Sequence, residues 1–145
     1  MTVMMPEAMV ERIRKCAEGA YPNECCGFLL GIADEKTLFI KNLLEVENAA
    51  DDSRQNRYLI PAKDFFSAEN SGKKLGLDII GVYHSHPDHP AVPSIVDQEN
   101  AVIDYLYLIL NVTNGQAGEL SGWIFNRDKG FFSREDPLIF DRRCL

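Results

Sequence analysis

The chain has 145 residues, of which 46% are hydrophobic and 26% are charged. These values predict one globular domain over residues 1–145 and argue against a disordered chain. The formal net charge of -7 disfavours nucleic acid as a partner, because an acidic surface repels phosphate groups. No apolar run reaches the length of a membrane span, and charges within residues 7–15 argue against a secretory signal. We therefore expect a cytoplasmic protein without a membrane partner, whose four cysteines are free thiols.

Near the start of the chain, the sequence predicts a helix followed by a β-hairpin. Apolar residues recur at helical spacing over residues 6–19, and Gly19 and Pro22 end this pattern. Two apolar runs, 25–32 and 38–44, are separated by a short polar turn, which predicts two paired strands.

The middle of the chain predicts a surface loop, a strand and a second helix. Residues 48–55 are polar and are expected to form the loop, whereas residues 57–60 are expected to form the strand. Pro61 suits the opening of a helix that carries Phe65, Ala68 and Leu75 on its apolar face and closes at Gly76.

The second half of the chain predicts two buried strands with a loop and a helix between them. The strands are expected over residues 77–83 and 105–112, where apolar side chains are continuous. Residues 84–93 contain three prolines and are expected to form the loop. The helix is expected to begin at Ser94 and to continue to about residue 104.

The last predicted elements are a turn at Asn114–Gly115 and two strands over residues 120–126 and 130–134. A short polar tail, 141–145, ends the chain. Because helices and strands alternate, the predicted fold class is α/β, a single domain with a mixed β-sheet packed between helices.

Two histidines at the end of a predicted strand and a carboxylate that follows them indicate a metal site. His84 and His86 are separated by one residue, and alternate residues of an extended chain point to the same side. Asp97 lies in the first turn of the next predicted helix, which the proline-rich loop can fold back over the strand end. Two imidazoles and one carboxylate, with a fourth position for water, are a catalytic zinc set, and nitrogen-rich ligation favours Zn²⁺ over Mg²⁺ or Ca²⁺. We expect one Zn²⁺ per chain.

A hydrolytic zinc site also needs a group that transfers protons. Glu24 precedes the apolar run 25–32, and a carboxylate in a mostly apolar setting suits this role. Ser94 is the candidate hydrogen-bond donor to a developing oxyanion. Each residue has a plainer explanation: Ser94 and Asp97 suit a helix N-cap and its third helical residue, and Glu24 suits a turn. The joint spacing favours the metal site.

The segment His84–Ser85–His86–Pro87, followed by Ser94 and Asp97 and preceded by Glu24, resembles the JAMM motif of the JAB1/MPN/Mov34 metalloprotease domain family. Every position of that motif is matched. The likeness covers most of residues 6–125 and fits the compact prokaryotic branch of the family. It implies a JAB1/MPN-like fold, with layers similar to those of cytidine-deaminase-like proteins.

The resemblance also implies an activity. Members of this kind are zinc-dependent metallopeptidases that hydrolyse a peptide or isopeptide bond after the C-terminal Gly-Gly of a ubiquitin-fold, sulfur-carrier-like protein. Carried over by position, the zinc ligands are His84, His86 and Asp97. Glu24 is then expected to activate the water and Ser94 to stabilise the tetrahedral intermediate. The resemblance leaves the oligomeric state open.

The sequence leaves open the roles of two neighbouring residues and two other functions. Ser85 and His89 lie beside the ligands, and each is a candidate either for supporting the site or for an ordinary role in the loop. A non-catalytic, protein-binding MPN domain is one alternative function, although the complete ligand set argues against it. A zinc hydrolase of a small amide is the other; a deaminase of this kind would need a Pro-Cys-x-x-Cys run, which the sequence lacks.

Overall fold

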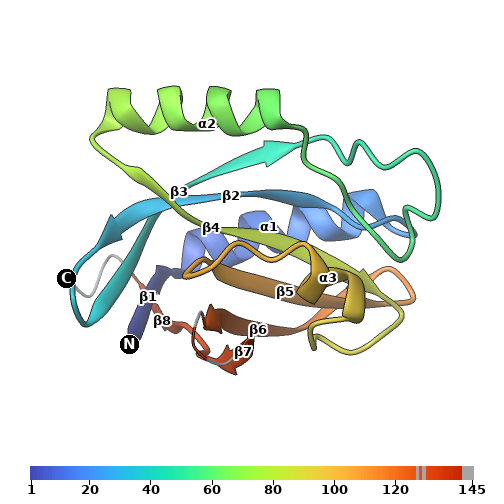
Figure 1. The fold of residues 1–145 in the computed structure, drawn as a ribbon. Coiled ribbons are helices and arrows are strands. Elements are labelled where there is room, and N and C mark those ends of the chain that lie inside the picture. The colour runs from blue at the N-terminus through green and yellow to red at the C-terminus, as the bar shows by residue number, and fades with distance from the viewer. Residues whose placement is uncertain (127, 129, 142–145) are drawn as a thin grey trace.

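The computed structural model describes residues 1–126, 128 and 130–141. Within them, eight strands form one sheet in the order β7-β6-β5-β4-β2-β3-β1-β8. The elements follow one another as β1 (Thr2–Pro6), α1 (Glu7–Ala20), β2 (Cys26–Ala33), β3 (Thr37–Val46), α2 (Ala62–Leu75), β4 (Asp78–Pro87), α3 (Ile95–Glu99), β5 (Leu106–Thr113), β6 (Gln116–Asn126), β7 (Phe131–Arg134) and β8 (Leu138–Phe140) (Figure 1).

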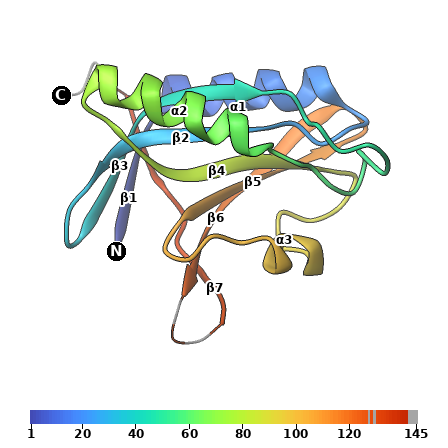
Figure 2. The same ribbon diagram turned by 45° about the horizontal axis from the view of Figure 1, so that its top comes forward.

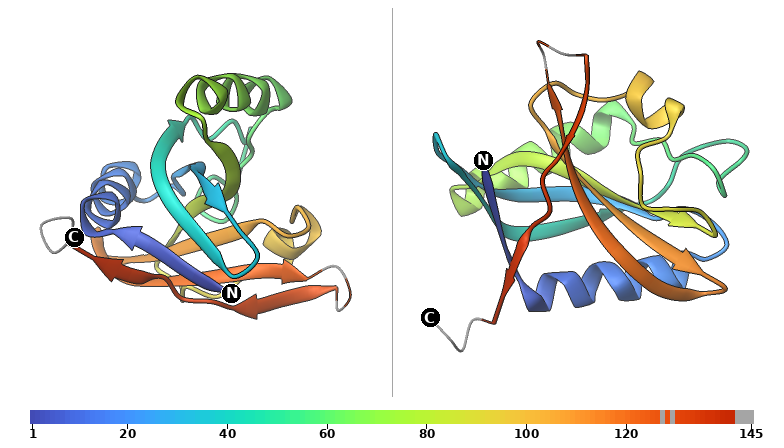
Figure 3. Two further views of the ribbon diagram at one scale, coloured as in Figure 1. Left: turned by 90° about the vertical axis from the view of Figure 1, so that its left-hand side faces the viewer. Right: turned by 90° about the horizontal axis from the view of Figure 1, so that it is seen from below.

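The sheet is mixed and strongly curled. Strand β4 is antiparallel to β2 and parallel to β5, and β1 is parallel to both of its neighbours, β3 and β8. Helix α1 lies inside the curl, whereas α2 crosses the opposite face (Figures 2 and 3). This arrangement confirms the predicted α/β class with a mixed sheet between helices.

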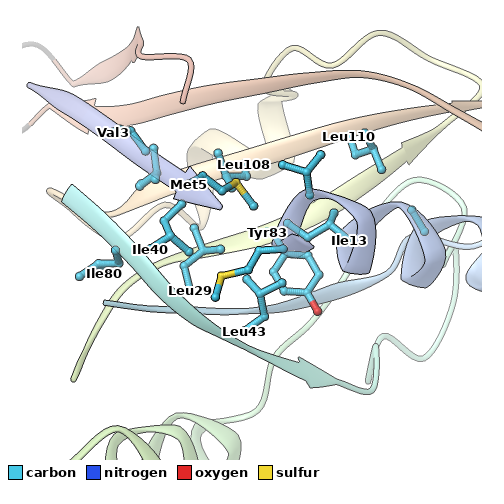
Figure 4. Close-up of a cluster of buried hydrophobic side chains, with 14 of the residues drawn as sticks. Val3, Met5, Ile13, Leu29, Ile40, Leu43, Ile80, Tyr83, Leu108 and Leu110 are labelled. Atoms are coloured by element: carbon cyan, nitrogen blue, oxygen red, sulfur yellow. The ribbon is translucent and has the colours of Figure 1, made fainter. Parts of the chain in front are cut away.

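The two faces of the sheet carry separate apolar clusters. The larger cluster surrounds α1 and joins its Ile13 to Met5, Leu29, Tyr83 and Leu108 of the sheet (Figure 4). The smaller cluster lies under α2 and contains Phe28, Ala68, Val82 and Tyr107. Because neighbouring strand residues point to opposite faces, Val82 and the alternate residues that follow it on β4 project from the α2 face.

Most predicted elements are confirmed, but two have different lengths. Strand β4 continues through His84 and His86 to Pro87, where a loop was predicted, because β5 pairs with it as far as Pro87 opposite Val112. Helix α3 has five residues instead of about eleven. Of the apolar face predicted for α2, Ala68 is buried and Phe65 packs against the smaller cluster as predicted, but Leu75 is 57% exposed.

Residues 57–60 were predicted as a strand, and this prediction is wrong. The segment has no regular structure: Asn48 donates from Nδ2 to the Arg57 carbonyl at 3.0 Å and accepts from the Leu59 N–H at 3.1 Å, and the Leu59 carbonyl accepts from the Ala49 N–H at 3.0 Å. Strands β1 and β8, at the two ends of the chain, were not predicted. Residues 142–145 of the predicted polar tail lie outside the described residues.

None of the described helices is long and apolar enough to cross a membrane. Cys16, Cys25 and Cys26 are free thiols, as the sequence predicted, and Cys144 lies outside the described residues.

Candidate metal centre and active site

His84 and His86 occupy the central part of the sheet. Both lie on β4 and are fully or almost fully buried, with exposed fractions of 0% and 1%. They are held between β2 and β5, where His84 is opposite Cys26 and Ile109. Their alternation directs both rings to the α2 face, and the two Nε2 atoms are 3.1 Å apart.

Asp97 reaches the histidines from α3. Ser94 caps this helix: its Oγ accepts from the Asp97 N–H at 3.1 Å, and its own N–H donates to Asp97 Oδ2 at 2.9 Å. The carboxylate then faces both rings, with Oδ1 at 3.2 Å from His84 Nε2 and Oδ2 at 3.1 Å from His86 Nε2. The structure thus brings the three predicted ligands together in one buried group.

The protonation of this group suits metal binding. His86 donates from Nδ1–H to the Pro90 carbonyl at 2.7 Å, which leaves the Nε2 lone pair directed at the group. Burial lowers the pKa of His84, so its ring is neutral near pH 7. Burial acts to raise the pKa of Asp97, but the neighbouring rings of His84 and His86 and the Ser94 N–H outweigh it, so the pKa is well below its ordinary value.

The spacing of the three donor atoms also matches the size of a zinc ion. Ligand atoms around a tetrahedral zinc ion at about 2.1 Å lie roughly 3.4 Å from one another. The two Nε2 atoms are 3.1 Å apart, and the two carboxylate oxygens of Asp97 lie 3.2 Å from His84 Nε2 and 3.1 Å from His86 Nε2. In addition, Nδ1 of His84 is buried without a hydrogen-bond partner, so this ring is not held in place by an ordinary polar contact on its other side. The residues present fit a zinc ion.

Glu24 lies beside this group, immediately before β2. Its peptide is held on both sides, since its N–H donates to the Arg54 carbonyl at 2.7 Å and its carbonyl accepts from Asn48 Nδ2 at 3.1 Å. The side chain is 2% exposed, and Oε1 has no hydrogen-bond partner. Burial, reinforced by repulsion from Asp97, raises the pKa of Glu24 to about 9. The carboxyl group can therefore hold a proton near neutral pH.

Ser85 points away from His84, His86 and Asp97, which together are called the metal group below, and faces the opposite side of β4. Its Oγ accepts from the Cys25 N–H at 2.8 Å, and its N–H donates to the Cys25 carbonyl at 3.2 Å. These contacts tie the strand with the histidines to the residue that follows Glu24. These contacts are compatible with a supporting role for Ser85, which stays a prediction.

Ser94 and His89 line an open cleft of about 610 Å³ next to the metal group, together with Pro22, Gln55 and Asn56. Because Ser94 Oγ accepts from Asp97, its O–H remains able to donate. His89 stacks on His86 with ring centroids 4.2 Å apart and donates from Nδ1–H to the Pro87 carbonyl at 2.8 Å. His89 lies outside the group of His84, His86 and Asp97.

Three contacts of the site were not predicted from the sequence. Tyr58 stacks on His84 with ring centroids 4.6 Å apart, Asn48 holds the Glu24 peptide, and the Pro90 carbonyl orients His86. Asn48 was interpreted only as part of a polar loop, and Tyr58 as part of a strand. No local pattern marks these residues, because each one acts across a long separation in sequence or through its backbone.

Comparison with known proteins agrees with this geometry. The family described as prokaryotic homologs of the JAB domain matches residues 6–125 of the chain. The chain belongs to the prokaryotic JAB domain family. The resemblance inferred from the JAMM motif is thereby confirmed.

Relatives of this JAB domain include a protein named desampylase from Haloferax volcanii. It is 34% identical over 104 residues, which cover 71% of this chain and 73% of the relative. A solved protein from Desulfitobacterium hafniense has a TM-score of 0.84 at 22% identity and covers 97% of this chain and 94% of its own. A JAB1/MPN domain protein from Archaeoglobus fulgidus has a TM-score of 0.55 at 18% identity, with coverage of 94% and 97%. The two structures support the fold, and the desampylase relative indicates a hydrolase.

Proposed function

We propose that the chain is a zinc metallopeptidase that hydrolyses the peptide or isopeptide bond after the C-terminal Gly-Gly of a ubiquitin-fold, sulfur-carrier-like protein. The observation that carries this proposal is the buried carboxyl group of Glu24, with an unpartnered oxygen, beside the group of His84, His86 and Asp97. A structural role for Glu24 alone would call for a partner for that oxygen, since an unsatisfied buried polar atom is costly.

Each side chain of the site has its own role in the proposed reaction. Zinc held by His84, His86 and Asp97 supplies a Lewis acid that polarises a carbonyl and lowers the pKa of water. Glu24 in its deprotonated form takes the proton from the attacking water and passes it to the leaving amine; its raised pKa favours holding that proton between the two steps. Ser94 donates its O–H to the oxygen on which negative charge develops.

The proposed substrate rests on the cleft and on the relatives. A Gly-Gly tail is narrow and lets its backbone approach a surface closely, which suits an open cleft beside a buried metal group. The Haloferax volcanii relative is named for the removal of a ubiquitin-like modifier. The Gly-Gly end and the ubiquitin fold of the partner are proposed for this chain by that analogy.

The test is an intact-mass measurement on zinc-loaded protein mixed with a ubiquitin-fold carrier that is extended past Gly-Gly. Native protein is expected to remove the extension, and Glu24→Gln is expected to leave it in place, with a loss of roughly 10²–10⁴ in rate. Glu99→Gln, an exposed change on the same helix as Asp97, serves as the control and is expected to match the native rate.

Two outcomes would replace the proposal. Survival of several extended carriers with both proteins, together with carrier binding, would favour a non-catalytic binding module. Turnover of free small amides without cleavage of any carrier would favour a small-molecule hydrolase.

A further inference from the structure

A second group of potential ligands lies next to the first. Donor atoms of Glu24, His86 and His89 all lie within 4.8 Å of one another. Among the described residues, no ion pair within 4.0 Å joins Glu24 to either histidine, so the three are close without direct contact. A limit of 4.8 Å leaves room for a cation between these donor atoms.

His89 is held in a position that leaves one nitrogen free. Its Nδ1–H is used by the Pro87 carbonyl, so the lone pair of Nε2 remains available. Its ring is stacked on His86, and its carbonyl accepts from Asn111 Nδ2 at 2.8 Å. The preceding residue, Asp88, accepts from the Tyr21 hydroxyl at 2.6 Å and from the Asn114 N–H at 2.9 Å. The loop is therefore pinned, and little ordering is needed for His89 to bind a cation.

The buried carboxyl group of Glu24 is a second indication of a ligand at this place. Its side chain is 98% buried, yet Oε1 has no hydrogen-bond partner. A buried oxygen in this condition gains more from a cation than an exposed acid does, because water does not already satisfy it.

Both groups of potential ligands contain His86, and this shared residue determines which group binds a cation first. Its Nδ1 is engaged by Pro90, and its Nε2 already faces His84 and Asp97 at 3.1 Å each. One free nitrogen can serve one ion, so filling of the first group leaves Glu24 and His89 alone for a second ion. We propose that Glu24 and His89 form a second, weaker site for a divalent cation such as Zn²⁺, adjacent to the metal centre.

A consequence for activity rests on the proposed function. A cation on the Glu24 carboxylate occupies the oxygens that accept the proton, so zinc above one equivalent is expected to inhibit hydrolysis reversibly. The binding itself does not depend on any activity and can be measured alone.

The experiment is a titration of metal-free protein with Zn²⁺ against a chromophoric chelator, repeated with Co²⁺ absorption. Native protein is expected to take up two equivalents, the second roughly ten-fold or more weaker, since fewer protein ligands hold it. Glu24→Gln and His89→Gln are each expected to keep the first equivalent, which also shows that they are folded, and to lose the second. Cys16→Ser is the control for zinc on thiols and is expected to keep both.

Saturation of native protein at one equivalent would overturn the inference. So would a second equivalent that survives in His89→Gln or disappears in Cys16→Ser. Two equivalents without hydrolysis of any carrier would support the second site and reject the proposed function. Carrier hydrolysis with a single equivalent of zinc would support the proposed function and reject the second site.

Discussion

At the scale of single residues, Glu24 and His86 are fixed by atoms other than the ones proposed to react. Glu24 is held by its peptide group, through Arg54 and Asn48, and not through its carboxylate. His86 is held through Nδ1 and keeps Nε2 for the metal group. In the proposed mechanism, each reactive atom is thus left unoccupied by the contacts that fix its position, which is the condition for preorganised catalysis.

The raised pKa of Glu24 predicts a pH dependence of stability. The pKa of Glu24 is about 9 in the folded protein against an ordinary value of 4.5. Between these values, the folded state binds more protons than the unfolded state, so the free energy of unfolding falls as pH rises. In chelator-treated protein, Glu24→Gln should remove this fall, so the gain in stability over native protein should grow from pH 5 to pH 8.

Urea denaturation at each pH measures this difference between the two proteins. Glu7→Gln, an exposed change at the start of α1, is the matched control and should show no such growth with pH. A difference between Glu24→Gln and native protein that stays constant from pH 5 to pH 8 would contradict the assigned pKa direction.

Ser85 offers a prediction about positioning. Ser85→Ala leaves the buried Cys25 N–H without its hydrogen-bond partner, which should lower the free energy of unfolding by about 1–3 kcal/mol. Turnover should fall with little change in KM, because Glu24 adjoins the loosened peptide. Ser67→Ala, on the exposed side of α2, should change stability by no more than about 0.5 kcal/mol. Equal effects from the two changes would reject the role of Ser85.

The residue types of the site could be predicted from the sequence, whereas their supports could not. The ligands and Glu24 have unusual chemistry at a fixed spacing, and local periodicity was enough to place His84 and His86 on one face. Tyr58 and Asn48 are ordinary residues in a segment without regular structure. Their roles depend on where the 47–61 segment between β3 and α2 lies against β2 and β4, which no local pattern specifies.

At the scale of elements, the errors in length have a common cause. Local proline content predicted a loop after residue 83, but pairing with β5 extends β4 to Pro87. Helical spacing predicted a long α3, but the chain must return to start β5 at Leu106, and Asp104 has a left-handed φ of 68°. Tertiary pairing therefore overrides local preference on both sides of the metal ligands.

The packing of β4 against β5 predicts a sensitive glycine. A Cβ atom at Gly81 would overlap with the backbone carbonyl oxygen of Leu106, which cannot rotate away as a side chain can. Gly81→Ala should therefore lower the free energy of unfolding by about 1–3 kcal/mol. It should also weaken zinc binding, because His84 lies three residues further along the same strand.

Gly19 provides the matched control for this change. It lies in α1 and is exposed, and a Cβ atom added there would have no neighbouring atom within 4 Å. Gly19→Ala should raise the free energy of unfolding by about 0.5–1 kcal/mol through helix propensity. Urea denaturation of both variants checks the pair, and a Gly81→Ala variant as stable as native protein would show that the two strands can separate at no cost.

At the scale of the whole molecule, the metal group joins two parts of the fold. His84 and His86 belong to the sheet, whereas Asp97 belongs to a short helix that is connected to it by loops. Zinc at 100 times its dissociation constant should therefore raise the free energy of unfolding by about 2.7 kcal/mol. Asp97→Asn should lose most of this gain, since it removes the charge of the ligand.

Thermal unfolding with zinc and with chelator measures this effect. The Asp97→Asn variant should keep the start of α3, because an amide oxygen can still accept from the Ser94 N–H. If zinc stabilised native protein and Asp97→Asn equally, Asp97 would not be a ligand.

The capping box of α3 has an evolutionary consequence. Oδ2 of Asp97 accepts the Ser94 N–H and faces His86 at the same time, so one atom both starts the helix and completes the metal group. Under the proposed function, selection on the helix and selection on the metal are therefore hard to separate at this position. A descendant that abandoned hydrolysis could exchange its histidines for apolar residues and fill the space. It would still be under pressure to keep a hydrogen-bond acceptor at position 97, and such an acceptor would persist as a trace of the lost metal.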